Sequence, residues 1–498
     1  MKKLFPDKVY NVTTLVGAGI AAFNFVLIIF LTLLDLIASE NNPYFGIVTF
    51  IILPGFLITG LLLIAYGIYK EDKREKSGDA LAPKLPQIDL NDPRQRRAVL
   101  IFVTGTAMLI LFTAFGSFKA YEYTESDRFC GETCHKVMEP EYTAYQASPH
   151  SKTNCVNCHI GPGTDWFVRS KLSGSYQVYS VLFNKYPRPI PTPIENLRPA
   201  RETCEQCHWT KHLYFQKISK VDYYSNDENN TRWSFKIAMN IGQGNPETGF
   251  VSGIHWHVNN NNRITYKTTD NKRMTIPWVK ITRADGKEII YKTKKSKKDF
   301  RNKEIETRTM DCIDCHNRPA HIYHPSTVAV NNYISLGWID KSIPFIKSIS
   351  TQALDRGYSS KQTALDSIKI FVESFYQLSY PDYYASNSKL VSKAINEIQK
   401  IYLRNYFPEM NVSWKYYPMQ IGHMYAPGCF RCHDGKHFAG KGKVISKNCD
   451  LCHSITSWQR ENDKPVYADA KSLTYVHPVE IGEALYTMNC SDCHTKSL

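Results

Sequence analysis

The sequence predicts a mostly helical and irregular fold, with three N-terminal transmembrane helices and a β-rich insert in the part that follows them. Three observations support this prediction. Three long apolar stretches lie before residue 120, fourteen cysteines form seven close pairs that are each followed at once by a histidine, and one region between two such pairs alternates apolar and polar residues. With 498 residues, 43% of them hydrophobic, the chain is long enough for several domains and is not disordered.

The three apolar stretches run from about residue 12 to 36, 45 to 68 and 99 to 118. Each is long enough to cross a bilayer, because about 20 residues at roughly 1.5 Å per residue span a hydrocarbon core of about 30 Å. A cleaved signal peptide is the alternative interpretation of the first stretch, but the two further stretches disfavour it. The sequence therefore predicts a membrane domain over residues 1–119.

The cysteine pattern predicts covalently attached haem. Two thioether bonds hold the porphyrin edge while the adjacent histidine reaches the iron, so one short turn supplies both the attachment and an axial ligand. A disulfide framework has no reason to require the histidines, and chance or a zinc half-site can explain one such motif but not six. We predict seven haem c groups, attached at Cys130 and Cys134, Cys155 and Cys158, Cys204 and Cys207, Cys312 and Cys315, Cys429 and Cys432, Cys449 and Cys452, and Cys490 and Cys493, with His135, His159, His208, His316, His433, His453 and His494 as the motif ligands.

One motif departs from the common spacing. Three residues rather than two separate Cys130 from Cys134. We still assign a haem to it, because every other cysteine of the chain belongs to a complete motif. The fold class is accordingly that of a multihaem cytochrome c, in which porphyrins replace much of the side-chain core.

Loop charges and haem attachment give the same orientation in the membrane. Lysines precede the first stretch, the loop of residues 70–97 carries eight Lys and Arg, and residues 40–44 carry none. The positive-inside rule places the N-terminus and the 70–97 loop in the cytoplasm. The haem-bearing part then lies on the periplasmic side of a bacterial inner membrane, which is where c-type haem is attached. The three stretches contain no histidine, which excludes a b-type haem with two histidine ligands inside the membrane.

The formal net charge of +15 does not indicate nucleic-acid binding. Seven haems bring about 14 propionate charges, which the iron and its porphyrin offset only in part. Much of the basic excess therefore compensates the cofactors, and the remainder suits anionic lipid or an acidic redox partner.

Nine histidines lie outside the motifs and can supply the second axial ligand of most irons. We expect about six of the nine to do so, although any single one can instead be a surface or hydrogen-bonding histidine. His212 lies four residues after His208 on the same helical face, so it suits a neighbouring haem better than its own. The candidate distal ligands are His150, His212, His257, His324, His423, His437 and His477.

Motif spacing and periodicity divide the outer part of the chain. Residues 120–212 hold three motifs, residues 213–300 read as β-hairpins with a turn at Asp285-Gly286, and residues 301–498 hold the last four motifs. Within the last region, residues of about 360–402 show helical periodicity that breaks near Tyr380-Pro381.

The segment from Cys130 to His208 resembles the NapC/NirT family of multihaem cytochromes. The matching residues are Cys134-His135-Lys136-Val137-Met138, Ser148-Pro149-His150, Cys155-Val156-Asn157-Cys158-His159, Lys171 and Val178-Tyr179. The resemblance implies quinol oxidation at the membrane surface, with Lys171 at the quinol site and either His135 or Met138 as an axial ligand of the first haem. The family commonly has an acidic residue six positions after the lysine, where this chain has Gln177.

Three membrane helices and seven haems look more like the inner-membrane cytochromes of the ImcH type, and the segment Gly428-Cys429-Phe430-Arg431-Cys432-His433-Asp434-Gly435 is also similar to that group. The resemblance implies that menaquinol is oxidised and that electrons pass to periplasmic c-type cytochromes or a reductase subunit. Lys171, with Tyr176 and Gln177 as polar partners, would bind the quinol oxygen.

Two other functions remain open at this point. A passive anchor would relay electrons from another subunit without touching quinol, and its extra membrane helices would form a docking surface. A multihaem reductase of nitrite or hydroxylamine would need an iron with an open coordination position. The supply of histidines and the absence of a Cys-x-x-Cys-Lys motif disfavour the reductase.

Overall fold

The computed structural model describes residues 9, 11–37, 52–77, 89–133, 135–161, 163–194, 198–208, 215–245, 250–258, 262–294, 307–469 and 471–495. It divides into two compact units. The first comprises residues 1–125 together with 160–173, and the second comprises residues 126–159 together with 174–498. All seven cysteine motifs belong to the second unit, so the haem-binding part of the chain can be described by itself. The four domain boundaries predicted above remain predictions.

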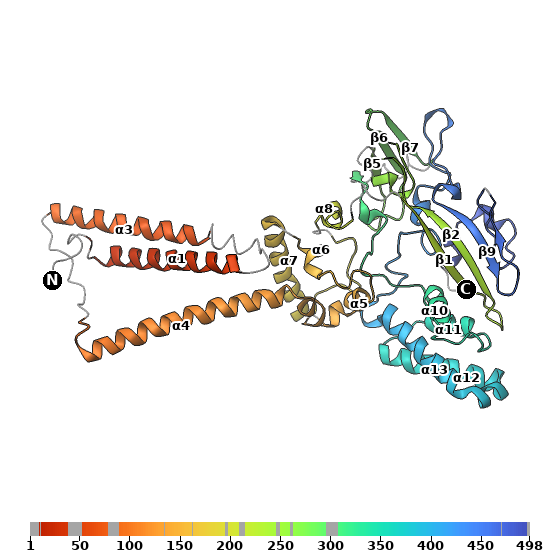
Figure 1. Cartoon of the computed structure of the whole chain (residues 1–498), viewed down its shortest axis with the longest axis horizontal. Helices are drawn as coiled ribbons and strands as arrows, with labels where there is room; N and C mark the ends of the chain where they lie inside the picture. The colour runs from red at the N-terminus through yellow and green to blue at the C-terminus, as the bar shows by residue number, and fades with distance from the viewer. Residues whose placement is uncertain are drawn as a thin grey trace. The chain divides into compact units, whose positions relative to one another are not determined.

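Two helices of the first unit are long and apolar enough to cross a membrane: α1 (Val12–Ile37) and α3 (Leu53–Lys76) (Figure 1). They pack closely, because small residues line their interface. A Cβ atom added to Gly17 would lie 2.7 Å from the carbonyl oxygen of Gly60, and one added to Gly67 would lie 2.4 Å from the Thr14 hydroxyl. Close approach at small residues is typical of helix pairs in membranes. The start of the second predicted stretch, residues 45–51, lies outside the described residues.

Helix α4 (Pro93–Thr124) covers the third predicted stretch. The Asp92 side chain caps its first turn by accepting the backbone N–H of Arg94, and Pro93 occupies the first helical position, where its missing N–H costs nothing. The helix is long enough to span a bilayer, since 32 residues extend about 48 Å. Its insertion into the membrane remains a prediction.

Short helices carry the first three motifs. They are the π-helical turn η3 (Phe129–Thr133), α5 (His135–Gln146), α6 (Cys155–His159) and α8 (Ala200–Cys204), while α7 (Thr164–Leu182) follows the second motif. The turn η3 lies at the unusual motif. A π-helical turn holds about one residue more than an α-helical turn. The turn η3 therefore accommodates the extra residue between the two cysteines of this motif. The second cysteine, Cys134, lies outside the described residues.

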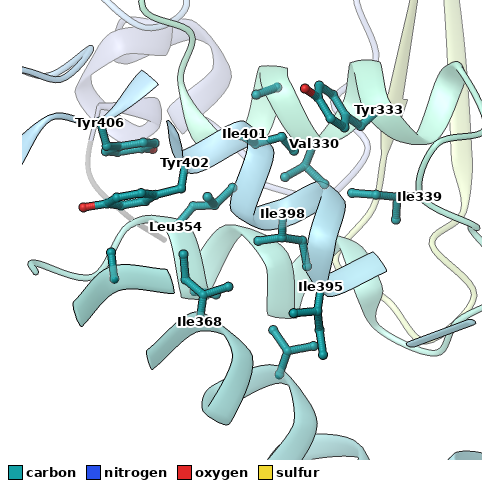
Figure 2. Close-up of a cluster of buried hydrophobic side chains, with 14 of the residues drawn as sticks. Val330, Tyr333, Ile339, Leu354, Ile368, Ile395, Ile398, Ile401, Tyr402 and Tyr406 are labelled. Atoms are coloured by element: carbon teal, nitrogen blue, oxygen red, sulfur yellow. The ribbon is translucent and has the colours of Figure 1, made fainter. Parts of the chain in front are cut away.

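Four helices build the largest apolar core of the described residues: α10 (Ser326–Ser335), α11 (Ile346–Leu354), α12 (Lys361–Ser379) and α13 (Pro381–Asn405). Figure 2 shows Ile368 of α12, Ile398 of α13 and Val330 of α10 pointing into one interior, and all three are fully buried. Helix α13 begins at Pro381, so the predicted break at Tyr380-Pro381 agrees with the structure. Burial of these side chains drives the packing of this helical module.

In the described part of the chain, ten strands form three antiparallel sheets. One sheet has the order β1-β2-β9-β10 and another the order β7-β6-β5-β8, with β3-β4 as a separate pair. The strands are β1 (Gln216–Tyr224), β2 (Arg232–Asn240), β3 (Gln243–Asn245), β4 (Phe250–Ser252), β5 (Asn262–Lys267), β6 (Trp278–Arg283), β7 (Glu288–Lys292), β8 (Thr307–Thr309), β9 (His453–Arg460) and β10 (Val466–Tyr467). The predicted turn at Asp285-Gly286 joins β6 to β7, and Gly286 adopts the positive φ that such a turn favours.

The β-rich insert is completed by the C-terminal region. Strand β9 directly follows the sixth cysteine motif and pairs with β2 from Trp233 to Met239, where Figure 1 shows the two strands side by side. The insert is therefore not a separate module, because the last motifs are attached to its sheet.

The remaining elements are short: the 3₁₀ turns η5 (Ile254–Val258), η6 (Cys312–Asp314), η7 (Pro408–Met410), η8 (Gly428–Arg431), η9 (Gly440–Gly442) and η10 (Cys449–Leu451), and the helices α14 (Ala484–Thr487) and α15 (Cys490–His494). Three of these turns and α15 carry the last four motifs. That porphyrins supply part of the core around these motifs remains a prediction.

Candidate haem sites and the membrane-proximal ion pair

Six of the seven motif histidines face a second histidine. The ring centres are 6.2 Å apart for His159 and His321, 6.0 Å for His208 and His150, 6.4 Å for His316 and His255, 5.7 Å for His433 and His257, 6.2 Å for His453 and His423, and 6.1 Å for His494 and His477. An iron held by two histidines separates the ring centres by about 6.2 Å, because each Fe–N bond is about 2.0 Å long and each nitrogen lies about 1.1 Å from its ring centre. The six gaps therefore fit six iron atoms with two histidine ligands each.

Hydrogen bonds leave the Nε2 atom of these histidines available for a metal. In five of the six partner rings and in one motif ring, Nδ1 lies within hydrogen-bonding distance of a backbone carbonyl oxygen: His150 with Pro319, His255 with Ile241, His257 with Ile254, His321 with Glu141, His477 with Val479, and the motif residue His433 with Ser446. A bond from Nδ1–H to a carbonyl fixes the ring orientation and the tautomer, as is usual for metal-binding histidines. This pattern fits haem ligation.

Burial favours the neutral imidazole that a metal requires. It lowers the pKa of His159 to about 4, and the neighbouring His321 lowers it further. Burial also lowers the pKa of His257, His316, His423, His453 and His494. A neutral ring offers a lone pair to iron at neutral pH without first losing a proton.

Two of the predicted distal haem ligands, His437 and His324, do not face a motif histidine among the described residues. His437 is 1% exposed, its Nδ1 lies 2.9 Å from the Asp434 carboxylate, and its Nε2 lies 2.6 Å from the carbonyl oxygen of Ile276. Both ring nitrogens are thus engaged, which leaves none for iron. His324 donates its backbone N–H to Asn405, and its ring faces no motif histidine among the described residues. A third candidate, His212, lies outside the described residues.

Sequence reasoning passed over two histidines that face motif rings, His255 and His321. His255 and His257 lie on the short turn η5 and face the rings of two different motifs, the fourth and the fifth. His321 follows the fourth motif by five residues but faces the second motif. The close spacing of His255 and His257 was the signal for the first, whereas His321 was marked only by its closeness to the fourth motif, which did not show that it would face the second.

Neighbouring motifs in the sequence are also neighbours in space. Cys155 interacts with Cys130, and Cys204 interacts with Cys312. Electrostatic interactions join Cys158 to Cys204 and Cys207, Cys315 to Cys429, Cys452 to Cys429, and Cys490 to Cys449. These contacts link the first motif to the second, the second to the third, and so on to the seventh.

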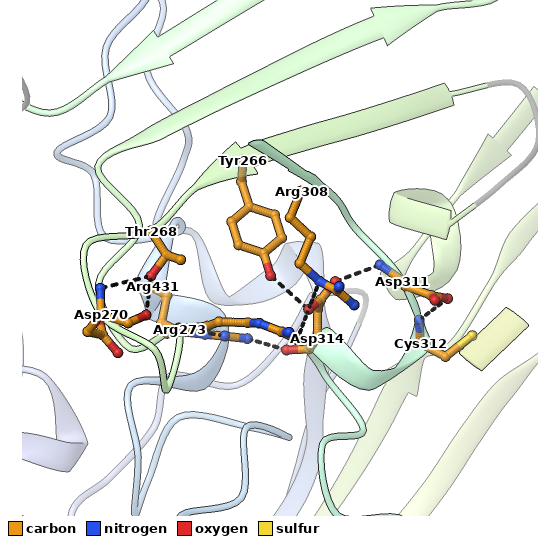
Figure 3. A network of polar contacts seen from close by, with 9 residues as sticks. All are labelled: Tyr266, Thr268, Asp270, Arg273, Arg308, Asp311, Cys312, Asp314 and Arg431. Atoms are coloured by element: carbon orange, nitrogen blue, oxygen red, sulfur yellow. Dashed lines mark hydrogen bonds and ion pairs between the residues drawn. The ribbon is translucent and has the colours of Figure 1, made fainter. Parts of the chain in front are cut away.

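A buried polar cluster joins the fourth and fifth motifs (Figure 3). Asp314, which lies between the two cysteines of the fourth motif, is 3% exposed and accepts hydrogen bonds from Tyr266 and Arg273 of the β-rich insert and from Arg308 of β8. Arg431, which lies between the two cysteines of the fifth motif, donates to the backbone carbonyl oxygens of Asp314 and Arg273. The insert therefore fixes two consecutive motifs against each other.

A second cluster positions His321. Arg318 is 9% exposed and binds both carboxylate oxygens of Glu141, at 2.7 and 3.0 Å. Its guanidinium carbon also lies 5.0 Å from the ring centre of Tyr323 and 4.4 Å from that of Tyr417. Because His321 contacts the backbone carbonyl of the same Glu141, this cluster holds the ring that faces His159.

The first motif lies against α5. A Cβ atom added to Gly131 would lie 2.2 Å from the ring of Tyr142, so only glycine fits at position 131. Met138 is a half-buried residue of α5. Both His135 and Met138 belong to α5, and the choice between them as a ligand of the first haem stays open.

The predicted quinol residues lie on α7. Lys171 forms an ion pair with Glu125, which directly follows α4, and its ammonium nitrogen lies 5.6 Å from the ring centre of Tyr121. Tyr176 is 67% exposed, and Gln177 is exposed as well. Positions five and six residues after Lys171 do not share its helix face. Sequence reasoning found the lysine but missed Glu125, which is 46 residues away.

Comparisons with known proteins identify one matching family model and two related proteins. Residues 92–220 match the model of the NapC/NirT cytochrome c family, N-terminal region. The chain is 40% identical over 490 residues to the cytochrome c-type protein ImcH of Geobacter sulfurreducens, covering 97% of this chain and 95% of that protein. It is 26% identical over 117 residues to the cytochrome c-type protein NrfH of Wolinella succinogenes, covering 22% of this chain and 66% of that protein.

No solved structure matches the chain significantly. The match to ImcH nevertheless extends over nearly the full length of both proteins, and the family model covers the first motifs and the Lys171 region. The chain therefore belongs to the NapC/NirT family of membrane-anchored c-type cytochromes, which carry haem and transport electrons.

Proposed function

We propose that this cytochrome oxidises menaquinol at the periplasmic surface of a bacterial inner membrane and passes the electrons through seven haems to periplasmic acceptors. The observation that carries the proposal is the series of six histidine pairs, each spaced for an iron, at motifs that follow one another in space in their sequence order. Bound haem supplies reversible one-electron transfer at each of these positions.

The proposed ligands of haems two to seven are the six facing pairs. His255 and His321 take the place of His324 and His437 in the predicted set, because both nitrogens of His437 are engaged and His324 faces no motif ring in the described part of the chain. Intact mass after purification should exceed that of the polypeptide by seven haems. A mass increase of only six haems would contradict the haem assigned to Cys130 and Cys134.

Two histidine ligands close an iron to substrates, and this favours electron transfer over substrate reduction. A nitrite or hydroxylamine reductase needs an open iron position, whereas six of the seven motif histidines already face a partner ring. The electron acceptors that we propose are therefore separate proteins: periplasmic c-type cytochromes or a reductase subunit.

Lys171 supports the quinol site. Its side chain is 38% exposed, so it is reachable by a ligand, and its ammonium group can hold a quinol or quinone oxygen by a charge-assisted hydrogen bond. Tyr176 and Gln177 remain proposed polar partners. Helix α4 ends one residue before Glu125, which pairs with Lys171, so the site lies at the end of the third proposed membrane helix.

Reduction of the purified protein by a menaquinol analogue, followed by haem absorbance, tests this function. Lys171→Ala should slow the reduction roughly ten- to hundredfold, because one charge-assisted hydrogen bond is worth about 1.5–3 kcal/mol. Dithionite should still reduce the variant at the wild-type rate.

The same experiment distinguishes quinol oxidation from the alternative function, that of a passive anchor. A passive anchor that relays electrons from another subunit would not accept electrons from menaquinol at all. Unchanged menaquinol kinetics in Lys171→Ala would instead move the quinol site elsewhere.

A further inference from the structure

We propose that Glu125 is the base that accepts a proton from the quinol hydroxyl that Lys171 binds. This inference rests on the proposed function and adds a catalytic residue to it. It follows from an ion pair that joins the end of α4 to α7, within the first compact unit.

The position of Glu125 is fixed by the end of α4. Its backbone N–H donates to the carbonyl oxygens of Tyr121 and Tyr123, which caps the helix. Its side chain is only 14% exposed, against 38% for that of Lys171. The carboxylate is therefore in direct contact with the ammonium group, next to any ligand oxygen that Lys171 binds.

Quinol oxidation needs a proton acceptor at the oxygen that reacts. Each menaquinol releases two electrons and two protons when it becomes menaquinone. Lys171 is cationic and cannot take a proton, but it can stabilise the oxygen as that oxygen loses one. Glu125 as a carboxylate accepts the first hydroxyl proton, the second leaves to water, and two oxidised haems each take one electron, so charge and atoms balance.

The neighbouring surface suits an apolar ring. Val168 and Leu172, three residues before and one after Lys171 on α7, are 52% and 69% exposed. Exposed aliphatic side chains next to a charged pair offer contact to a naphthoquinone and its isoprenoid tail, which arrive from the bilayer. Among the described residues of this unit, Glu125 pairs with Lys171 from α7, whose ammonium nitrogen also lies 5.6 Å from the ring centre of Tyr121.

A second ion pair on α4 provides a matched control. Glu122 binds Lys119 at 2.6 Å, with exposed fractions of 59% and 55% for the two side chains. This pair spans three residues of one helix and resembles an ordinary surface pair, which contributes little. Glu122→Gln changes the same charge one turn earlier without touching Lys171.

The test compares Glu125→Gln, Glu125→Asp and Glu122→Gln in the complete haem-loaded protein, with a soluble menaquinol analogue as electron donor. Glu125→Gln should lower the maximal reduction rate at least about tenfold, with little change in the quinol concentration for half-maximal rate. Glu125→Asp should recover part of the rate, and Glu122→Gln should match the wild type.

Infrared difference spectra give a readout independent of the rate. Adding quinol should produce a protonated-carboxyl band that is absent in Glu125→Gln. If Glu125→Gln keeps the wild-type rate, or weakens only quinol affinity, Glu125 is not the base. If menaquinol fails to reduce even the wild-type protein, the proposed function falls and this inference falls with it.

Discussion

Asp314→Asn should destabilise the haem-bearing unit strongly, because the buried Asp314 carboxylate pairs with two arginines in the cluster that joins the fourth and fifth motifs. Its carboxylate receives hydrogen bonds from Tyr266 at 2.7 Å and from Arg273 and Arg308 at 3.0 Å. The substitution keeps the size of the side chain but removes its charge. Two guanidinium groups, with side chains 18% and 25% exposed, would then lose their counter-ion.

The size of the expected stability loss follows from the burial of Asp314 and its two arginine partners. Removing one partner of a buried ion pair costs about 3–5 kcal/mol, since the remaining charge is left uncompensated. At about 2 °C per kcal/mol for a large domain, the melting temperature should fall by roughly 6–10 °C. Tyr266 adds to the loss, because burial and the Asp314 carboxylate raise the pKa of its phenol, which donates to that carboxylate.

Thermal unfolding of the haem-loaded protein, followed by circular dichroism, measures this effect. Asp285→Asn is the control, because Asp285 lies in the turn between β6 and β7, is 49% exposed and forms an ion pair with nearby Lys287. It should melt like the wild type. Equal melting temperatures for Asp314→Asn and Asp285→Asn would refute the reasoning that the buried cluster stabilises the unit.

Three other predictions concern the haem ligands, the first motif and the membrane topology. His255→Gln should convert one haem to the high-spin form in electron paramagnetic resonance spectra, whereas His324→Gln should leave all haems unchanged; the reverse result would overturn the proposed ligands. Gly131→Ala should cost about 1–3 kcal/mol of stability or reduce haem attachment at the first motif, because its Cβ would overlap the Tyr142 ring, and adding Tyr142→Ala should recover part of the loss in a mass and melting assay. A reporter active only in the cytoplasm should work when inserted near Asp79 and fail at the C-terminus, and the opposite pattern would contradict the loop-charge argument.

The covalent part of the sites could be predicted from the sequence alone. A haem attachment motif is local, because both cysteines and the proximal histidine come from one turn of chain. The two apolar stretches that became α1 and α3 are likewise local, since length and hydropathy suffice to identify them. The break at Tyr380-Pro381 also follows from a single proline, which cannot continue a helix.

Only the tertiary structure decided which distant groups meet. His321 faces His159 from 162 positions further along the chain, because the Glu141–Arg318 pair holds it there. His437 looked as suitable as His423 in the sequence, yet packing against Asp434 and Ile276 engages both of its nitrogens. The physical reason is that a proximal ligand is set by bonds within one turn, whereas a facing histidine, a buried Asp314 or the pairing of Glu125 with Lys171 depends on how separate segments pack.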